Sequence, residues 1–186
     1  MCEFASGFFK PDTMEVRVWD LSSHSATQEH YGLHDTDRPD SWREFHYLPN
    51  GTIECRIIDG DTHTSRECES AMRARWPRFL DFLTWALASI GDEYPCCLDL
   101  NGLTSAKGLT LSKHVGSDLD LSGLTSAKGL TLPERVGGWL DLNGLTSAKG
   151  LTLPEHVGGD LYLSGLTSAE EKTALIERFG NKVILS

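Results

Sequence analysis

The chain has 186 residues, of which 39% are hydrophobic, so it can bury a core, but no apolar run approaches the roughly 18 residues that a membrane-spanning helix needs. Its first residues, MCEFASGFFKPD, lack the basic region and the long apolar core of a signal peptide. The formal net charge of −10 disfavours direct nucleic-acid binding, which needs a basic surface, and favours a basic protein partner or mimicry of nucleic acid.

The acidic side chains are concentrated in the first half of the chain. Residues 1–97 contain 17 Asp or Glu against 9 Lys or Arg, whereas residues 98–186 contain 10 against 8. The five cysteines are an odd number without a CxxC pair, which favours a reducing compartment over a disulfide framework. We therefore expect a cytoplasmic protein.

The first half of the chain has the pattern of a small α+β module. Residues 15–21 alternate as in a strand, and the polar segment 22–40, rich in Ser, His and Asp, has the character of a loop. Residues 42–48 and 52–58 flank an Asn-Gly pair suited to a turn, so we expect a β-hairpin over 42–58.

Two helices should follow this hairpin. Ser65 can cap the first helix, and Pro77 interrupts it. Apolar residues then recur at helical spacing over 79–90, and Gly91 is a suitable stop. Because an open stack of repeats exposes its core, we expect the helix over 79–90 to cap the repeats that come next.

Three nearly identical blocks of 21 residues fill most of the second half. They span 98–118, 119–139 and 140–160, and a fourth block begins at Leu161 and breaks off after Ala169. A fixed period of this length indicates stacked structural units that bury their apolar edges against one another. Each block starts with a Leu-Asp-Leu or Leu-Tyr-Leu strand, and a glycine follows where we expect the chain to turn.

The repeats end in a different pattern. EEKTALIERFG predicts a short helix, and Val183 and Leu185 then occupy the positions of the strand leucines. We therefore expect parallel strands that begin at Leu98, Leu119, Leu140, Leu161 and Val183.

These elements define the expected fold class and domains. We predict an α+β protein in which a small N-terminal strand, hairpin and helix module, residues 1–91, caps a five-rung parallel β solenoid, residues 92–186. A C-terminal helix and strand close the solenoid. An extended solenoid offers a binding face and rarely builds a closed catalytic pocket, so the repeats favour recognition over catalysis.

Alternation along the strands predicts which side chains leave the core. The leucines point inward, so the residues beside them point outward, about 4.8 Å apart from one repeat to the next. Stacked carboxylates repel one another, and an exposed Trp among them has no folding reason, which together indicate a site for an Arg- or Lys-rich partner. We call this set the acidic stripe, and its predicted partner-binding residues are Asp99, Asp118, Asp120, Trp139, Asp141, Asp160 and Tyr162.

Two further columns repeat with the same period. We expect both on solvated turns; they are Lys107, Lys128 and Lys149, and His114, Arg135 and His156.

The motif VGGxLxLxGLTS is similar to short leucine-rich-like repeats of bacterial and bacteriophage proteins, and LPxxVxGxLxLxGLxS loosely follows the bacterial leucine-rich repeat. The resemblance covers roughly residues 95–169 and departs where that family has an Asn ladder, since glycines such as Gly123 fall near that site. HSATQEH, WREFHYLPNG and IECRI in the front module loosely resemble small phage or prophage proteins. The resemblance implies a solenoid and, for a phage protein, a location in the host bacterial cytoplasm.

Charge and resemblance together favour a non-enzymatic protein-binding module. The role they suggest is a bacteriophage-encoded inhibitor that occupies a basic or nucleic-acid-binding surface of a host defence complex, as an anti-CRISPR protein does. We predict no catalytic residue, metal or cofactor, because no nucleophile elbow, HExxH motif or phosphate-binding loop is present.

Two alternatives remain open. The first is a metal-dependent enzyme that uses the His- and Asp-rich segment 22–40, where His30 and His34 have the spacing of zinc ligands on a helix. The second is a structural protein whose repeats mediate self-assembly.

Overall fold

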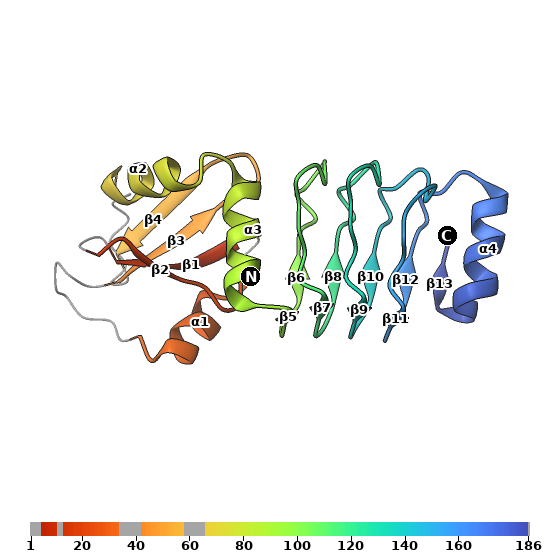
Figure 1. The fold of residues 1–186 in the computed structure, drawn as a ribbon, viewed down its shortest axis with the longest axis horizontal. Coiled ribbons are helices and arrows are strands. Elements are labelled where there is room, and N and C mark those ends of the chain that lie inside the picture. The colour runs from red at the N-terminus through yellow and green to blue at the C-terminus, as the bar shows by residue number, and fades with distance from the viewer. Residues whose placement is uncertain (1–4, 11–12, 34–41, 58–65, 186) are drawn as a thin grey trace. The chain divides into compact units, whose positions relative to one another are not determined.

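The computed structural model describes residues 5–10, 13–33, 42–57 and 66–185 and divides into two units, residues 1–90 and 91–186 (Figure 1). It contains helices together with antiparallel and parallel sheets, which confirms the predicted mixture of α and β structure.

The first unit is built on an antiparallel sheet with the strand order β2-β1-β3-β4. The predicted hairpin forms its second half, with Phe45 opposite Cys55 at the centre of the pairing. The strands are β1 (Ala5–Lys10), β2 (Glu15–Arg17), β3 (Arg43–Tyr47) and β4 (Ile53–Ile57).

Strand β1, which pairs with both β2 and β3, was not expected from the sequence. A side chain at Gly7 in this strand would collide with the Arg17 carbonyl, 2.7 Å away, and with Val18 and Phe45. The small residues of β1 therefore allow close packing. Strand propensity does not predict such residues, because it disfavours glycine within a strand. The predicted strand over 15–21 is also shorter, since β2 ends at Arg17.

The polar segment after β2 contains a helix, α1 (His24–Tyr31), where the sequence suggested a loop. Its ends explain why it forms: the Ser23 hydroxyl accepts a hydrogen bond from the Ala26 amide, and Gly32 closes the helix in the left-handed conformation at φ 60°. Tertiary contacts support the caps, since the Tyr31 hydroxyl donates to the Val18 carbonyl at 3.2 Å and Thr27 is buried.

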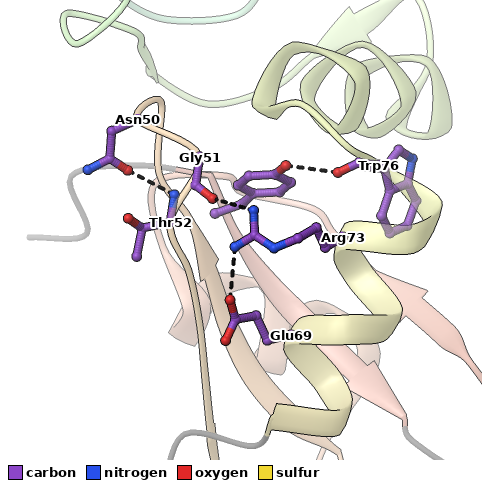
Figure 2. Close-up of polar contacts among 7 residues, drawn as sticks. Asn50, Gly51, Thr52, Glu69, Arg73 and Trp76 are labelled. Carbon is purple, nitrogen blue, oxygen red and sulfur yellow. Dashed lines mark hydrogen bonds and ion pairs between the residues drawn. The ribbon is translucent and has the colours of Figure 1, made fainter.

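Helices α2 (Arg66–Arg75) and α3 (Phe79–Ile90) lie on either side of Pro77, as predicted. The phenol of Tyr47 on β3 donates to the Trp76 carbonyl at 2.8 Å and so ties the sheet to the end of α2 (Figure 2). The α3 ring of Phe82 packs edge to face on Phe45, with centroids 5.4 Å apart. The role of α3 as a cap on the repeats stays a prediction.

The turn of the hairpin is also tied to α2. Arg73 donates to the Gly51 carbonyl at 3.2 Å and to Glu69 at 2.8 Å, while the Asn50 side chain accepts from the Thr52 amide (Figure 2). These contacts hold the turn of the hairpin against α2, so their role is structural.

Cys55 is completely buried in the sheet and disulfide-bonded to a cysteine outside the described side chains. The sequence favoured a reducing compartment over a disulfide framework, and the disulfide at Cys55 is evidence against that expectation. An odd number of cysteines says nothing about whether two of them meet in the fold.

The second unit contains a five-stranded parallel sheet with the order β13-β12-β10-β8-β6. The first leucine of each repeat strand is at most 2% exposed, so the apolar alternation faces inward as expected. The strands are β6 (Leu98–Asp99), β8 (Leu119–Asp120), β10 (Leu140–Asp141), β12 (Leu161–Tyr162) and β13 (Val183–Ile184).

A second parallel sheet, with the order β11-β9-β7-β5, forms the other side of the repeats. The column of His114, Arg135 and His156 lies in its strands and not on turns, because the valine after each of these residues is buried and draws the pair into a ladder. The strands are β5 (Glu93–Tyr94), β7 (His114–Val115), β9 (Arg135–Val136) and β11 (His156–Val157).

The chain turns at the glycines after the first strand of each repeat, as expected, and the Leu124 amide donates to the Leu121 carbonyl at 3.0 Å across one of these turns. These glycines do not have positive φ. Positive φ occurs instead at Gly129 and its equivalents, in the Ser-Ala-Lys-Gly turns. At Gly144, a Cβ would collide with the carbonyl of Ser122 in the preceding repeat and lie 2.6 Å from that of Leu124. Close stacking of backbones, and not a special conformation, therefore requires glycine here.

The repeats end at α4 (Ala169–Phe179), the 3-10 helix η1 (Gly180–Lys182) and strand β13. Lys182 donates to the carbonyls of Val157 and Gly158 at 2.8 and 3.0 Å, so backbone acceptors of the third repeat have a partner. In α4, Leu175 is buried, while Ile176 is 51% exposed.

Candidate binding surface

The aspartates after the first strand leucines form a column across the five-stranded sheet. Asp99 pairs in register with Asp120 and Asp120 with Asp141, and Tyr162 continues the column. Neighbouring strands of a sheet lie about 4.8 Å apart, so three carboxylates succeed one another at this spacing.

The residues before the strand leucines form a parallel row. The amides of Leu98, Leu119 and Leu140 donate to the carbonyls of Asp118, Trp139 and Asp160, each at 2.8 or 2.9 Å. Because residues on either side of a buried strand position share the opposite face, this row lies beside the aspartate column. The structure thus brings the residues of the acidic stripe onto one strand face.

Each aspartate of the column also serves the local backbone, which the sequence pattern alone did not indicate. The carboxylates of Asp99, Asp120 and Asp141 accept hydrogen bonds from the amides two residues later, at 3.1, 2.9 and 2.8 Å. Such Asx turns stabilise the bend after the strand. The sequence contains a signal for this turn. In the pattern Asp-Leu-Asn-Gly or Asp-Leu-Ser-Gly, the aspartate lies two residues before an Asn-Gly or Ser-Gly pair, which is typical of a turn.

Asp118 has a related role between repeats. Its carboxylate accepts from the Trp139 amide of the next repeat at 2.9 Å. The stripe therefore has a structural reason for its aspartates, and a purely functional interpretation of their repetition is incomplete.

The carboxylates still repel one another. Burial raises the pKa of Asp141 above its ordinary value, the charge of Asp120 raises it further, and the hydrogen bond from the Asn143 amide opposes both effects. Among the described residues, no Lys or Arg forms an ion pair with a carboxylate of the acidic stripe. Within the described part of the chain, the stripe is therefore an acidic surface whose carboxylates have amide donors but no cationic partner.

An aromatic pair stands at the C-terminal end of the stripe. Trp139 and Tyr162 pack edge to face with ring centroids 6.3 Å apart, and both are partly exposed. The Tyr162 hydroxyl approaches the Asp160 carboxylate at 3.5 Å. The pair offers a rigid apolar patch next to the carboxylates.

The opposite sheet carries mixed charges. Glu93, His114, Arg135 and His156 are in register and line a shallow surface pocket of about 420 Å³. Beside them Lys113 pairs with Asp92 at 2.8 Å, and this pairing lowers the pKa of Asp92 and raises that of Lys113. Cationic and acidic side chains are interspersed on this face, in contrast to the acidic stripe.

The segment suggested for a metal site is described in part. His30 stacks on Trp19 with centroids 3.7 Å apart, and the helix that contains it, α1, ends at Tyr31. Residues 34–41 lie outside the described part of the chain. Within the described residues, no three His, Cys, Asp or Glu side chains are arranged to hold a metal ion.

In the described parts of both units, no helix combines the length and the apolar character needed to cross a bilayer. No protein family, curated protein or solved structure matches this chain.

Proposed function

We propose that this chain is a non-enzymatic protein-binding module in which the repeats form a leucine-rich-like solenoid and the acidic stripe binds a basic surface of its partner. The observation that carries the proposal is the in-register column of Asp99, Asp120 and Asp141, to which the structure supplies no counter-charge from the described residues.

The energetics of the stripe favour a cationic partner. Stacked carboxylates raise the free energy of the unbound protein, and Arg or Lys side chains placed between them remove this repulsion. Trp139 and Tyr162 supply the aromatic anchor that interfaces commonly use, because large rigid rings lose little conformational entropy on binding.

The similarity of the repeats to those of bacterial and bacteriophage proteins, together with the net charge of −10, supports a specific setting. In this setting the protein is a phage-encoded inhibitor of a host defence complex such as a CRISPR effector. It acts by occupying a basic or nucleic-acid-binding surface, and long-range attraction steers it there.

The charge of the stripe can be tested without disturbing its turns. In the double variant Asp120→Asn/Asp141→Asn, the amide oxygens still accept the backbone hydrogen bonds, while two negative charges are lost. With a hexa-arginine peptide as the probe, we expect the affinity measured by isothermal titration calorimetry to fall about fivefold, as for two partly exposed ion pairs.

The matched control removes the same charge from the opposite sheet. Glu134→Gln/Glu155→Gln changes two exposed side chains next to β9 and β11 and should bind the peptide nearly as well as the wild type. Equal weakening in both double variants would show that only net charge matters and would remove the acidic stripe as the docking site.

A further inference from the structure

The three Ser-Ala-Lys-Gly turns of the repeats have identical sequences, at residues 105–108, 126–129 and 147–150. Each turn has its glycine at positive φ, between 78° and 87°, and the serine hydroxyl accepts from the lysine amide. The turns therefore present the same groups in the same local geometry.

The third turn already binds a carboxylate. Glu171, in the first turn of α4, accepts from the Ser147 hydroxyl with one oxygen at 2.7 Å and from the Ala148 amide with the other at 2.8 Å. These two donors, and the nearby charge of Lys149, hold the pKa of Glu171 below its ordinary value. A Ser-Ala-Lys turn is thus a two-donor carboxylate site in this fold.

The second turn offers the same donors without a carboxylate. Among the described residues, no acceptor is found for the Ser126 hydroxyl or the Ala127 amide, and no acidic side chain pairs with Lys128. A surface pocket of about 440 Å³ opens at this place, lined by the second and third turns. It lies one repeat before the position of the Glu171 carboxylate.

The first turn is a poorer candidate. Its Ala106 is only 1% exposed, whereas Ala127 and Ala148 are partly exposed. A ligand therefore has better access to the second turn.

We propose that the pocket at Ser126, Ala127 and Lys128 is a second binding site, which takes the carboxylate of a Glu or Asp side chain from an acidic peptide. The site lies apart from the acidic stripe and has the opposite charge preference, so it does not depend on the function proposed above.

The bound group in the third turn identifies the class of ligand. It is a side-chain carboxylate whose two oxygens match two neighbouring donors, and it comes from the first turn of a helix. Hydrogen bonds to a charged acceptor are about twice as strong as those between neutral groups, so two donors and a lysine suffice for weak, specific capture.

The test is a titration of the full chain with a blocked hexaglutamate peptide, followed by amide chemical shifts. We expect the largest saturable shift at the Ala127 amide and a smaller one at the Ala148 amide, which is already bonded to Glu171. In Glu171→Ala the shift of the Ala148 amide should increase. Blocked hexaglutamine should have no effect.

Variants assign the response to the site. Ser126→Ala/Lys128→Ala should weaken binding about tenfold or more, the value for one lost hydrogen bond to a charged group. Lys113→Ala removes the same charge from the other sheet and should leave the affinity unchanged; the unperturbed remainder of the spectrum shows that each variant is folded.

Three results would overturn the proposal. They are no saturable shift at Ala127, equal weakening by Lys113→Ala, and a response to inorganic phosphate with none to hexaglutamate. The last result would assign the pocket to phosphate instead of to an acidic peptide.

Discussion

Each aspartate of the column has two opposing effects on stability. Its carboxylate accepts a hydrogen bond from the amide two residues later, and its charge lies beside a like charge on the next strand. At Asp141 the unfavourable effects are larger, since burial and the charge of Asp120 leave its pKa raised. The hydrogen bond needs only an acceptor oxygen, whereas the charge has no role in the unbound fold.

Because the unfavourable effects at Asp141 exceed the favourable hydrogen bond, we expect Asp141→Asn to stabilise the protein at neutral pH. A raised native pKa means that the folded state binds the proton more tightly than the unfolded state, so the stability cost is present at neutral pH and disappears as the pH falls through the native pKa towards 3.8. Asn imitates the neutral form. We expect a higher melting temperature than the wild type at pH 7 and a difference that shrinks at about pH 4.

Asp92→Asn is the control with the opposite sign. The ion pair with Lys113 lowers the pKa of Asp92, so its charge stabilises the fold above that pKa, and the substitution should lower the melting temperature at pH 7. Circular dichroism melts at both pH values check both signs. A lower melting temperature for Asp141→Asn at pH 7 would mean that the carboxylate hydrogen bond outweighs the repulsion.

The strands of the repeats are only two residues long, so stacking of successive repeats holds them in place. The contact between Gly144 and the Ser122 carbonyl shows how closely the backbones approach. Gly144→Ala should destabilise the protein by about 1–3 kcal/mol, as expected for a side chain forced into a packed site.

The variant Gly150→Ala serves as a comparison, because it has a conformational cost without a steric clash. Gly150 has φ 78°, and no other part of the protein lies within 4 Å of the place that a Cβ would take, so alanine there meets only the conformational cost of about 1 kcal/mol. Urea unfolding of both variants should place Gly144→Ala below Gly150→Ala in stability. The reverse order would contradict the stacking argument.

The repeats were the most predictable elements. A period of 21 residues with Leu-Asp-Leu at the start of each block was enough to predict parallel strands and an outward-facing aspartate column. The second parallel sheet was missed because each repeat shows only one apolar residue there, as at Val136, between a charged residue and glycine. A single inward valine has no visible alternation.

The first unit was harder to predict because its local signals are weak. Strand β1 contains Gly7, which the packing needs and which strand propensity penalises. Helix α1 combines its two caps with tertiary contacts, such as the hydrogen bond from Tyr31 to Val18. In the second unit, Glu171 was predictable only as part of a helix. Its contact with Ser147 joins residues 24 apart in sequence, and no local pattern encodes such a pair.

At the scale of the whole molecule, the two units have different electrostatic characters. The first half of the chain carries most of the excess negative charge, whereas the charges of the repeats lie in the acidic stripe, in a second sheet of mixed charge and in lysine-bearing turns. Net charge governs the long-range approach of a partner, and the local arrangement governs where it binds.

The most direct test of the central claim is to map where a basic ligand binds the full chain. In a titration with hexa-arginine followed by amide chemical shifts, we expect the largest saturable changes on β8, β10 and β12 and at the Trp139 side chain, with little change on β7, β9 and β11. Shifts confined to the first unit, or spread equally over both sheets, would contradict the assignment of the acidic stripe as the docking surface.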